Sequence, residues 1–158
     1  QALTGYALIM HYLPCPDTDW PPDGWENLKS DNTCVFDEGW LPGAQLAVPA
    51  TDAWGRWLRY RADSTFTNHQ ALKLFSIDDA ENASTFEVIG DYGNVTSKTS
   101  RPIAIVLSHG ENGLGGIQSV SGGPAYRLPA PTQLAELENA DGDVQFYEGA
   151  QQQRAGAV

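Results

Sequence analysis

The chain has 158 residues, of which 41% are hydrophobic, so its length suits one domain with a real core. It carries 9 basic and 20 acidic residues, for a net charge of −11. A surface this acidic repels phosphate backbones, so we expect no nucleic-acid partner for this domain. The charge could instead attract cations or a basic partner, or serve only solubility.

The first predicted element is a helix over residues 1–13. Leu3, Ala7 and Met10 recur at spacings of four and three, the period of a helix with one buried face, so they are expected to pack on the domain. The segment has no charged side chain apart from His11 and no N-cap residue before its first apolar position. Two interpretations stay open: the second half of a longer helix, or an ordinary N-terminal helix without a cap.

Residues 14–43 follow as a long irregular region, and Pro14 and Pro16 mark its start. A loop of this length is unusual in a compact domain, and a disulfide between Cys15 and Cys34 would brace it. In an oxidising compartment that bond closes a loop of about 20 residues and stabilises the fold by on the order of 3 kcal/mol. The alternative is two unpaired buried thiols.

The same region holds three carboxylates, Asp17, Asp19 and Asp23, before a turn at Gly24. Calcium prefers several hard oxygen ligands, so this cluster is a candidate calcium site, although the two prolines before Asp23 rule out EF-hand spacing. A second acidic cluster lies near the other end of the chain: Glu138, Asp141 and Asp143. The alternative for both clusters is a solvated acidic loop, in which case the domain has no cofactor.

Residues 44–148 form the β-rich part, where apolar residues recur at every second position. The strand predicted at 57–62 places Tyr60 on its apolar face and Arg59 and Arg61 on the other. Further strands are predicted at residues 71–77, 85–89, 102–108 and 144–147, with a short helix at 132–139.

The strand at 102–108 is a continuous apolar run, which is typical of a buried strand. One leading helix followed mainly by antiparallel strands predicts a single α+β domain over residues 1–150. The polar tail at 151–158 is expected to be flexible.

The glycine-rich stretch after Ser108 and His109 raises the question of catalysis. It lacks the Gly-Lys-Ser/Thr ending of a phosphate-binding loop. Neighbouring residues on a strand point to opposite faces, so Ser108 and His109 would not form a nucleophile and its base. Because the sequence holds no coherent catalytic set, we expect no enzyme activity.

A series of blocks spans roughly residues 2–148 in a specific order: Ala2-Leu3-Thr4-Gly5-Tyr6-Ala7, Leu13-Pro14-Cys15-Pro16, Cys34, Gly39-Trp40-Leu41-Pro42 and Asp52 to Tyr60. In this order they resemble the soluble part of a type IV pilin-like protein, a minor pilin or a type II secretion pseudopilin. The resemblance implies an N-terminal helix packed on an antiparallel β-sheet. The prepilin peptidase motif and a membrane-spanning half-helix are absent from the sequence, so it implies a domain without its N-terminal transmembrane half-helix.

The resemblance implies a structural subunit of a type IV pilus or pseudopilus filament that acts by assembly. Its partners would be other pilin or pseudopilin subunits and the inner-membrane assembly machinery. It would be a precursor in the bacterial inner membrane, held there only through the missing helix, and then part of a periplasmic or extracellular filament. Arg56, Arg59 and Arg61 could contact a neighbouring subunit's carboxylates, or form a solvent-facing strand surface balanced by local acids.

A second interpretation is a small secreted binding module. Tryptophan rings exposed on a surface serve as stacking platforms for carbohydrates. The candidates in this sequence are Trp20, Trp25, Trp40 and Trp57.

Overall fold

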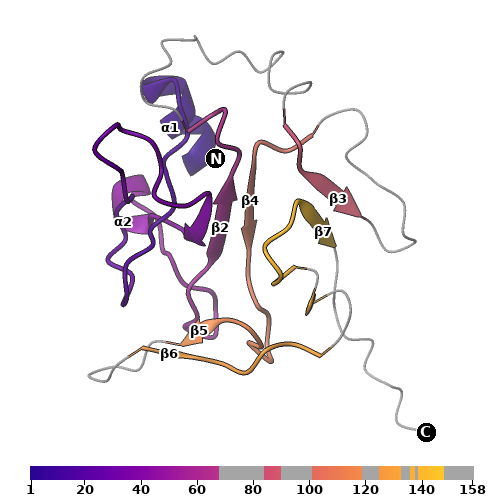
Figure 1. The fold of residues 1–158 in the computed structure, drawn as a ribbon. Coiled ribbons are helices and arrows are strands. Elements are labelled where there is room, and N and C mark those ends of the chain that lie inside the picture. The colour runs from indigo at the N-terminus through magenta and orange to yellow at the C-terminus, as the bar shows by residue number, and fades with distance from the viewer. Residues whose placement is uncertain (68–83, 90–100, 119–124, 133–135, 138, 148–158) are drawn as a thin grey trace, which may run out of the picture.

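A short N-terminal helix packs on an antiparallel sheet in the computed structural model, which describes residues 1–67, 84–89, 101–118, 125–132, 136–137 and 139–147 (Figure 1). The elements in these ranges are α1 (Ala2–Met10), β1 (Glu38–Trp40), α2 (Gly43–Leu46), β2 (Arg59–Ala62), β3 (Glu87–Ile89), β4 (Ala104–Leu107), β5 (Ile117–Gln118), β6 (Tyr126–Arg127) and β7 (Gln145–Tyr147). Neither α1 nor α2 has the length and apolar content of a membrane span. The mixture of helix and antiparallel sheet confirms the predicted α+β class.

The central sheet has the strand order β1-β2-β4, and both pairings are antiparallel. The two-residue period predicted for β2 is confirmed. Tyr60 and Ala62 are fully buried on one face of this strand, whereas Arg59 and Arg61 lie on the other. The Tyr60 hydroxyl donates a hydrogen bond of 3.0 Å to the Pro14 carbonyl, so even the polar tip of this buried ring is satisfied.

Two smaller sheets complete the described structure. β5 and β6 pair antiparallel, whereas β3 and β7 pair in parallel, with Val88 opposite Phe146. The strands were predicted to be mainly antiparallel, and the parallel pair is an exception that the sequence did not indicate. β3 and β7 are far apart in sequence, and only a long crossover, as in this chain, can join parallel strands.

The sequence also predicts four further segments: the strands at 102–108 and 71–77, the helix at 132–139 and the tail at 151–158. β4 lies within the predicted strand at 102–108, but it is not buried: it lies at the edge of the described three-stranded sheet and Val106 is exposed. An apolar run therefore did not distinguish a buried strand from one covered on a single face. Of the helix predicted at 132–139, Glu136 and Leu137 are helical. The strand at 71–77 and the tail at 151–158 lie outside the described residues.

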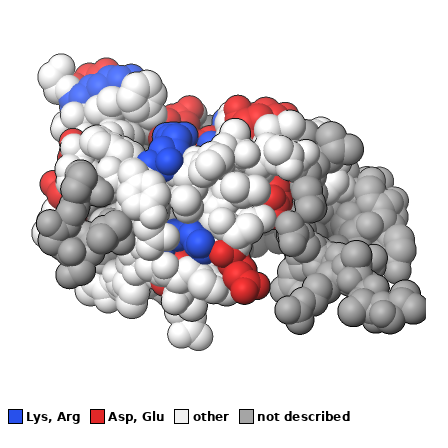
Figure 2. Space-filling model, turned by 90° about the horizontal axis from the view of Figure 1, so that it is seen from below, with Lys and Arg blue, Asp and Glu red and all other residues white. Residues whose placement is uncertain are grey.

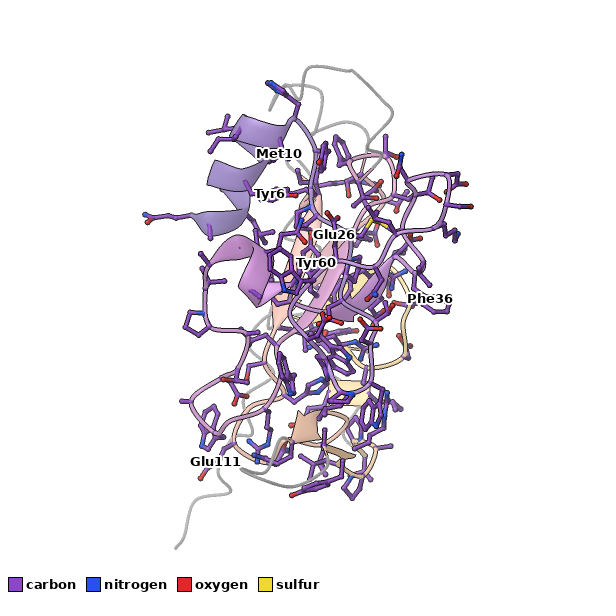
Figure 3. The ribbon with its side chains drawn as sticks, turned by 90° about the vertical axis from the view of Figure 1, so that its left-hand side faces the viewer. Tyr6, Met10, Glu26, Phe36, Tyr60 and Glu111 are labelled. Carbon is purple, nitrogen blue, oxygen red and sulfur yellow. A yellow bond between two sulfur atoms is a disulfide. The ribbon has the colours of Figure 1, made fainter. Side chains whose placement is uncertain are left out.

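The core lies between α1 and the central sheet. Its buried cluster consists of Ala7, Leu13, Leu41, Leu46, Tyr60 and Ala62, and Leu3 and Tyr6 pack against it. Leu3 and Ala7 thus face inward as predicted. Met10 does not: its side chain is 41% exposed, because α1 ends there and the chain reverses at His11, which has a φ of 64°. Tyr6 provides the third inward side chain instead (Figure 3).

The disulfide between Cys15 and Cys34 is present, as predicted, with the two Cα atoms 5.3 Å apart. It braces a loop that also bonds directly to β1. The Asp17 amide donates to the Trp40 carbonyl at 3.0 Å, and the Trp40 amide donates to the Asp17 carbonyl at 2.8 Å. A Cβ at Gly39 would collide with the Asp17 carbonyl oxygen, so this close approach requires glycine.

Candidate functional site

The predicted calcium ligands come together in the structure. Side-chain oxygens of Asp17, Asp19 and Asp23 lie within 4.8 Å of one another, with Asp17 buried and the other two exposed. Turns in a loop held at one end by β1 and the disulfide bring them to this position. Three carboxylates this close repel one another, and a bound cation would relieve that repulsion.

Several of these oxygens already accept hydrogen bonds. The two Asp17 oxygens accept from the amides of Asp19 at 3.0 Å and Gly24 at 2.6 Å. Asp23 accepts from the Trp25 amide at 2.9 Å. Burial raises the pKa of Asp17 above its usual range, and the nearby charges of Asp23 and Asp19 add to this, against the lowering effect of the two amides. Calcium binding at this cluster stays a prediction.

The second acidic cluster is described only in part, since Glu138 lies outside the described residues. Asp141 and Asp143 are both exposed. An oxygen of Asp143 accepts a hydrogen bond of 2.7 Å from the Gln145 amide at the start of β7. Calcium binding here stays a prediction as well.

Arg56 holds a loop of its own chain. Its guanidinium donates to the carbonyls of Gly110 at 2.5 Å and Glu111 at 2.9 Å. A Cβ at Gly113 would overlap this guanidinium, so the loop wraps closely around the side chain. Bonds inside the chain therefore occupy the Arg56 side chain, and its contact with a partner stays a prediction.

Arg59 and Arg61 share one carboxylate on the neighbouring strand. Arg59 forms an ion pair with Glu38, and the other Glu38 oxygen is 3.4 Å from Arg61. Arg61 also donates to the carbonyls of Gly142 and Asp143, and it lies 5.5 Å from the centre of the Phe86 ring. Both guanidiniums are partly buried, and contact with a neighbouring subunit stays a prediction for them too.

A pocket of about 340 Å³ opens beside Arg59. Its lining includes Thr18, Phe36, Glu38, Trp40, Arg59 and Arg127. Burial lowers the pKa of Arg59 to about 10, and the charges of Arg127 and Arg61 lower it further, against Asp141. Arg127 itself is exposed on β6 and makes no ion pair or hydrogen bond within the described part of the chain.

Sequence reasoning missed this pocket. Glu38 and Phe36 lie in the region predicted to be irregular, and Arg127 lies in a segment for which no element was predicted. Arg59 and Arg127 are separated by 67 intervening residues, and no local pattern predicts that β6 places its arginine near β2. In the sequence, this region was marked by the closely spaced arginines Arg56, Arg59 and Arg61.

Ser108 and His109 do not act on each other. The Ser108 hydroxyl donates to an Asp52 oxygen at 2.7 Å. His109 packs beside Gly116, and its buried Nε2 atom has no hydrogen-bond partner among the described residues. Burial lowers the pKa of His109 to about 4, with the charge of Arg59 as the next cause. The ring is therefore neutral near neutral pH.

Comparisons of the chain with known family models, curated proteins and solved structures found no match. The function is therefore argued from three features of the surface: the acidic cluster, the arginine-lined pocket and the exposed apolar side chains.

The exposed apolar side chains include a group on α1 and a group in the loop that follows it. On α1, Leu8 is 59% exposed and Ile9 is 77% exposed. In the loop after α1, Trp20 and Trp25 are each 56% exposed. The other tryptophans proposed as stacking platforms, Trp40 and Trp57, are partly buried.

Proposed function

We propose that this chain is the globular domain of a filament subunit of the type IV pilin-like class, a minor pilin or a type II secretion pseudopilin. The observation that supports this most is the character of α1. All nine residues of α1 lack charge, and Leu3, Tyr6 and Ala7 pack on the domain. The opposite side exposes Leu8 and Ile9 to solvent.

Such a helix is suited to a second apolar surface. Leaving a leucine or isoleucine in water forgoes about 1.5–3 kcal/mol each relative to burial, and exposed apolar patches on otherwise polar proteins mark interaction sites. In a filament, the outer side of α1 would pack among the helices of neighbouring subunits. The side of the sheet that carries Arg59 and Arg61 would then face outward.

The proposal includes the cellular setting. The subunit would be made as a precursor in the bacterial inner membrane, extracted by an assembly machinery there, and built into a periplasmic or extracellular filament. The Cys15–Cys34 disulfide suits such an oxidising compartment. On this proposal the domain acts by assembly and contact with partners, without catalysis.

The test is a cysteine crosslink in the full-length protein expressed in its source cells. Ile9→Cys adds a thiol on the exposed side of α1, and both cysteines of the sequence given are already paired with each other. A thiol-specific bismaleimide should yield a crosslinked dimer in the sedimenting, sheared-filament fraction. Glu111→Cys is the control, because Glu111 is exposed at the opposite end of the molecule from α1 (Figure 3).

Two results together would overturn the proposal. One is a monomer for both cysteine variants. The other is a mature N-terminus, read by mass spectrometry, that matches a conventional signal-peptidase cut and not an N-methylated residue heading an apolar segment.

A secreted carbohydrate-binding module is the second candidate, and the exposure of Trp20 and Trp25 favours it. Its test is a titration with neutral glycans, read by tryptophan fluorescence. Quenching that Trp20→Ala and Trp25→Ala both abolish would support the module. Unchanged fluorescence over the whole glycan set would count against it.

A further inference from the structure

The pocket beside Arg59 has more cationic than anionic groups. Arg59 and Arg127 line it, and Arg61 is close enough to Arg59 to affect it electrostatically. Among the residues that the structure describes, the carboxylate that forms ion pairs with these side chains is Glu38. Asp141 is close enough to affect Arg59 electrostatically, but it is exposed and forms no ion pair with that side chain. On a chain with a net charge of −11, this is a local excess of positive charge. A bound anion would supply the missing counter-charge.

The guanidiniums are not equally available. Arg59 and Arg61 are partly buried and bonded to Glu38, so their positions are fixed before any ligand arrives. Arg127 is exposed and has no partner in the described ranges, so all its donors are open to a ligand. Guanidinium groups bind carboxylates in a planar, two-point geometry.

The other walls suit a ring. Phe36 is 65% exposed and Trp40 is partly buried, and both line the pocket. An aromatic face packs well against the C–H face of a sugar ring. Glu38 offers acceptor oxygens for hydroxyl groups. A volume of about 340 Å³ is at the small end of ligand pockets, which fits a single ring.

We propose that this pocket binds a sugar carboxylate of the hexuronic acid class. Its carboxylate would lie on the guanidinium of Arg127, with Arg59 beside it. Its ring would rest against Trp40 or Phe36, and its hydroxyls would donate to Glu38. Neutral sugars lack the negative charge that the arginines would bind, and small inorganic anions lack the ring that would pack on the aromatic side chains.

This inference does not depend on the filament proposal. Phe36 lies on the opposite side of the molecule from α1, so the pocket and the exposed side of α1 can both be occupied at once (Figure 3). From the end that carries β5 and β6, basic side chains lie near the middle of the surface with carboxylates beside them (Figure 2). The pocket also differs from the Trp20 and Trp25 surface of the second candidate function.

The experiment is a nuclear magnetic resonance titration with sodium glucuronate, followed at the Trp40 indole N–H and assigned with a Trp40→Phe variant. The chemical shift of this N–H should change on binding and reach saturation, with a Kd below about 10 mM. An affinity of this order is expected for a small site with one main charge contact. Glucose is the neutral control, and sodium sulfate is the anion without a ring. Both should bind at least about fivefold more weakly than glucuronate.

Two substitutions test whether glucuronate binds in this pocket. Arg127→Gln should raise the Kd for glucuronate by about tenfold, because it removes a charge-assisted contact. Lys29→Gln removes the same charge at an exposed position outside the pocket and should change the Kd by less than about twofold. Thermal unfolding of both variants checks that each is folded.

Four outcomes would overturn the proposal. Equal affinity for glucose and glucuronate would mean that the guanidiniums do not bind the carboxylate. Equal affinity for sulfate would mean that the pocket is an unspecific anion site. No shift with glucuronate, or an unchanged Kd in Arg127→Gln, would mean that the pocket does not bind a sugar acid.

Discussion

At the scale of single residues, Gln45 connects segments that are far apart in the chain. Its Nε2 donates to the Tyr6 hydroxyl at 2.7 Å and to Glu26 at 2.6 Å, while its Oε1 accepts from the Glu26 amide at 3.0 Å. Glu26 in turn accepts from the Cys15 amide at 2.8 Å. One amide side chain on α2 thus joins α1 to the disulfide loop, and no sequence motif indicated this.

Gln45→Ala should therefore destabilise the domain. It leaves the partly buried Glu26 carboxylate and the Tyr6 hydroxyl short of a partner, which costs about 1–3 kcal/mol. Urea unfolding followed by tryptophan fluorescence measures the change. The control is Gln1→Ala at an exposed position, which should change the free energy of unfolding by less than about 0.5 kcal/mol. Equal effects of the two substitutions would contradict the prediction.

His109 should make stability depend on pH. Its pKa falls from the ordinary value of 6.5 to about 4 in the folded chain, mainly because of burial. The unfolded chain therefore binds a proton near pH 6.5 that the folded chain does not take up until about pH 4. The free energy of unfolding should fall as the pH falls through this interval, by about 1 kcal/mol near pH 5 after allowance for partial solvent exposure.

His109→Gln isolates this contribution. The measurement is the difference in unfolding free energy between the variant and the parent chain, at neutral pH and near pH 5. The variant should lose less stability on acidification than the parent. His11→Gln, at an exposed position, is the control and should follow the parent. A parallel response of all three proteins would refute the role of His109.

At the scale of elements, the two sides of α1 have different neighbours. Leu3 packs on the buried cluster, whereas Leu8 is mostly exposed. The sequence predicted the helix and its inward residues Leu3 and Ala7 from their spacing. It could not predict the exposure of Met10, which has the angular position of a buried residue. That exposure depends on where the chain reverses, and the turn at His11 has no glycine or proline to signal it.

The same substitution on the two sides should therefore give different results. Leu3→Ala should lower the free energy of unfolding by about 1–3 kcal/mol, since it removes packed methyl groups from the edge of the core. Leu8→Ala should lower it by less than about 0.5 kcal/mol. Because both variants carry the same change in one helix, helix propensity affects them alike. Similar losses in both, measured by chemical denaturation, would show that α1 does not pack as described.

At the scale of the whole molecule, the sheet divides the domain into two sides. On the apolar side of β2, Tyr60 belongs to the buried cluster that also contains Ala7 of α1. On the other side, Arg59 pairs with Glu38, and both side chains line the pocket. The alternation in β2 was readable from the sequence because its period is local. The parallel pairing of β3 with β7 and the approach of Arg127 to Arg59 depend on how distant segments meet, and local patterns carry no information on that.

The disulfide makes the whole domain sensitive to its redox setting. The chain with Cys15→Ala and Cys34→Ala should lose on the order of 3 kcal/mol of unfolding free energy, because the unfolded loop is no longer closed. The parent chain in reducing agent should show a similar loss, and the double variant should not respond to the reductant. Urea midpoints under both conditions measure this. A parent chain whose midpoint is unchanged on verified reduction would contradict the prediction.

The alternation along β2 also restricts how this chain can change in length. Arg59 and Tyr60 are adjacent, yet one lies on the charged side of the sheet and the other is fully buried. Deleting one residue inside β2 would shift every later side chain to the other side and direct a guanidinium into the apolar core. Insertions and deletions should therefore be absent from β2 in any working variant of this protein, even where single replacements are tolerated.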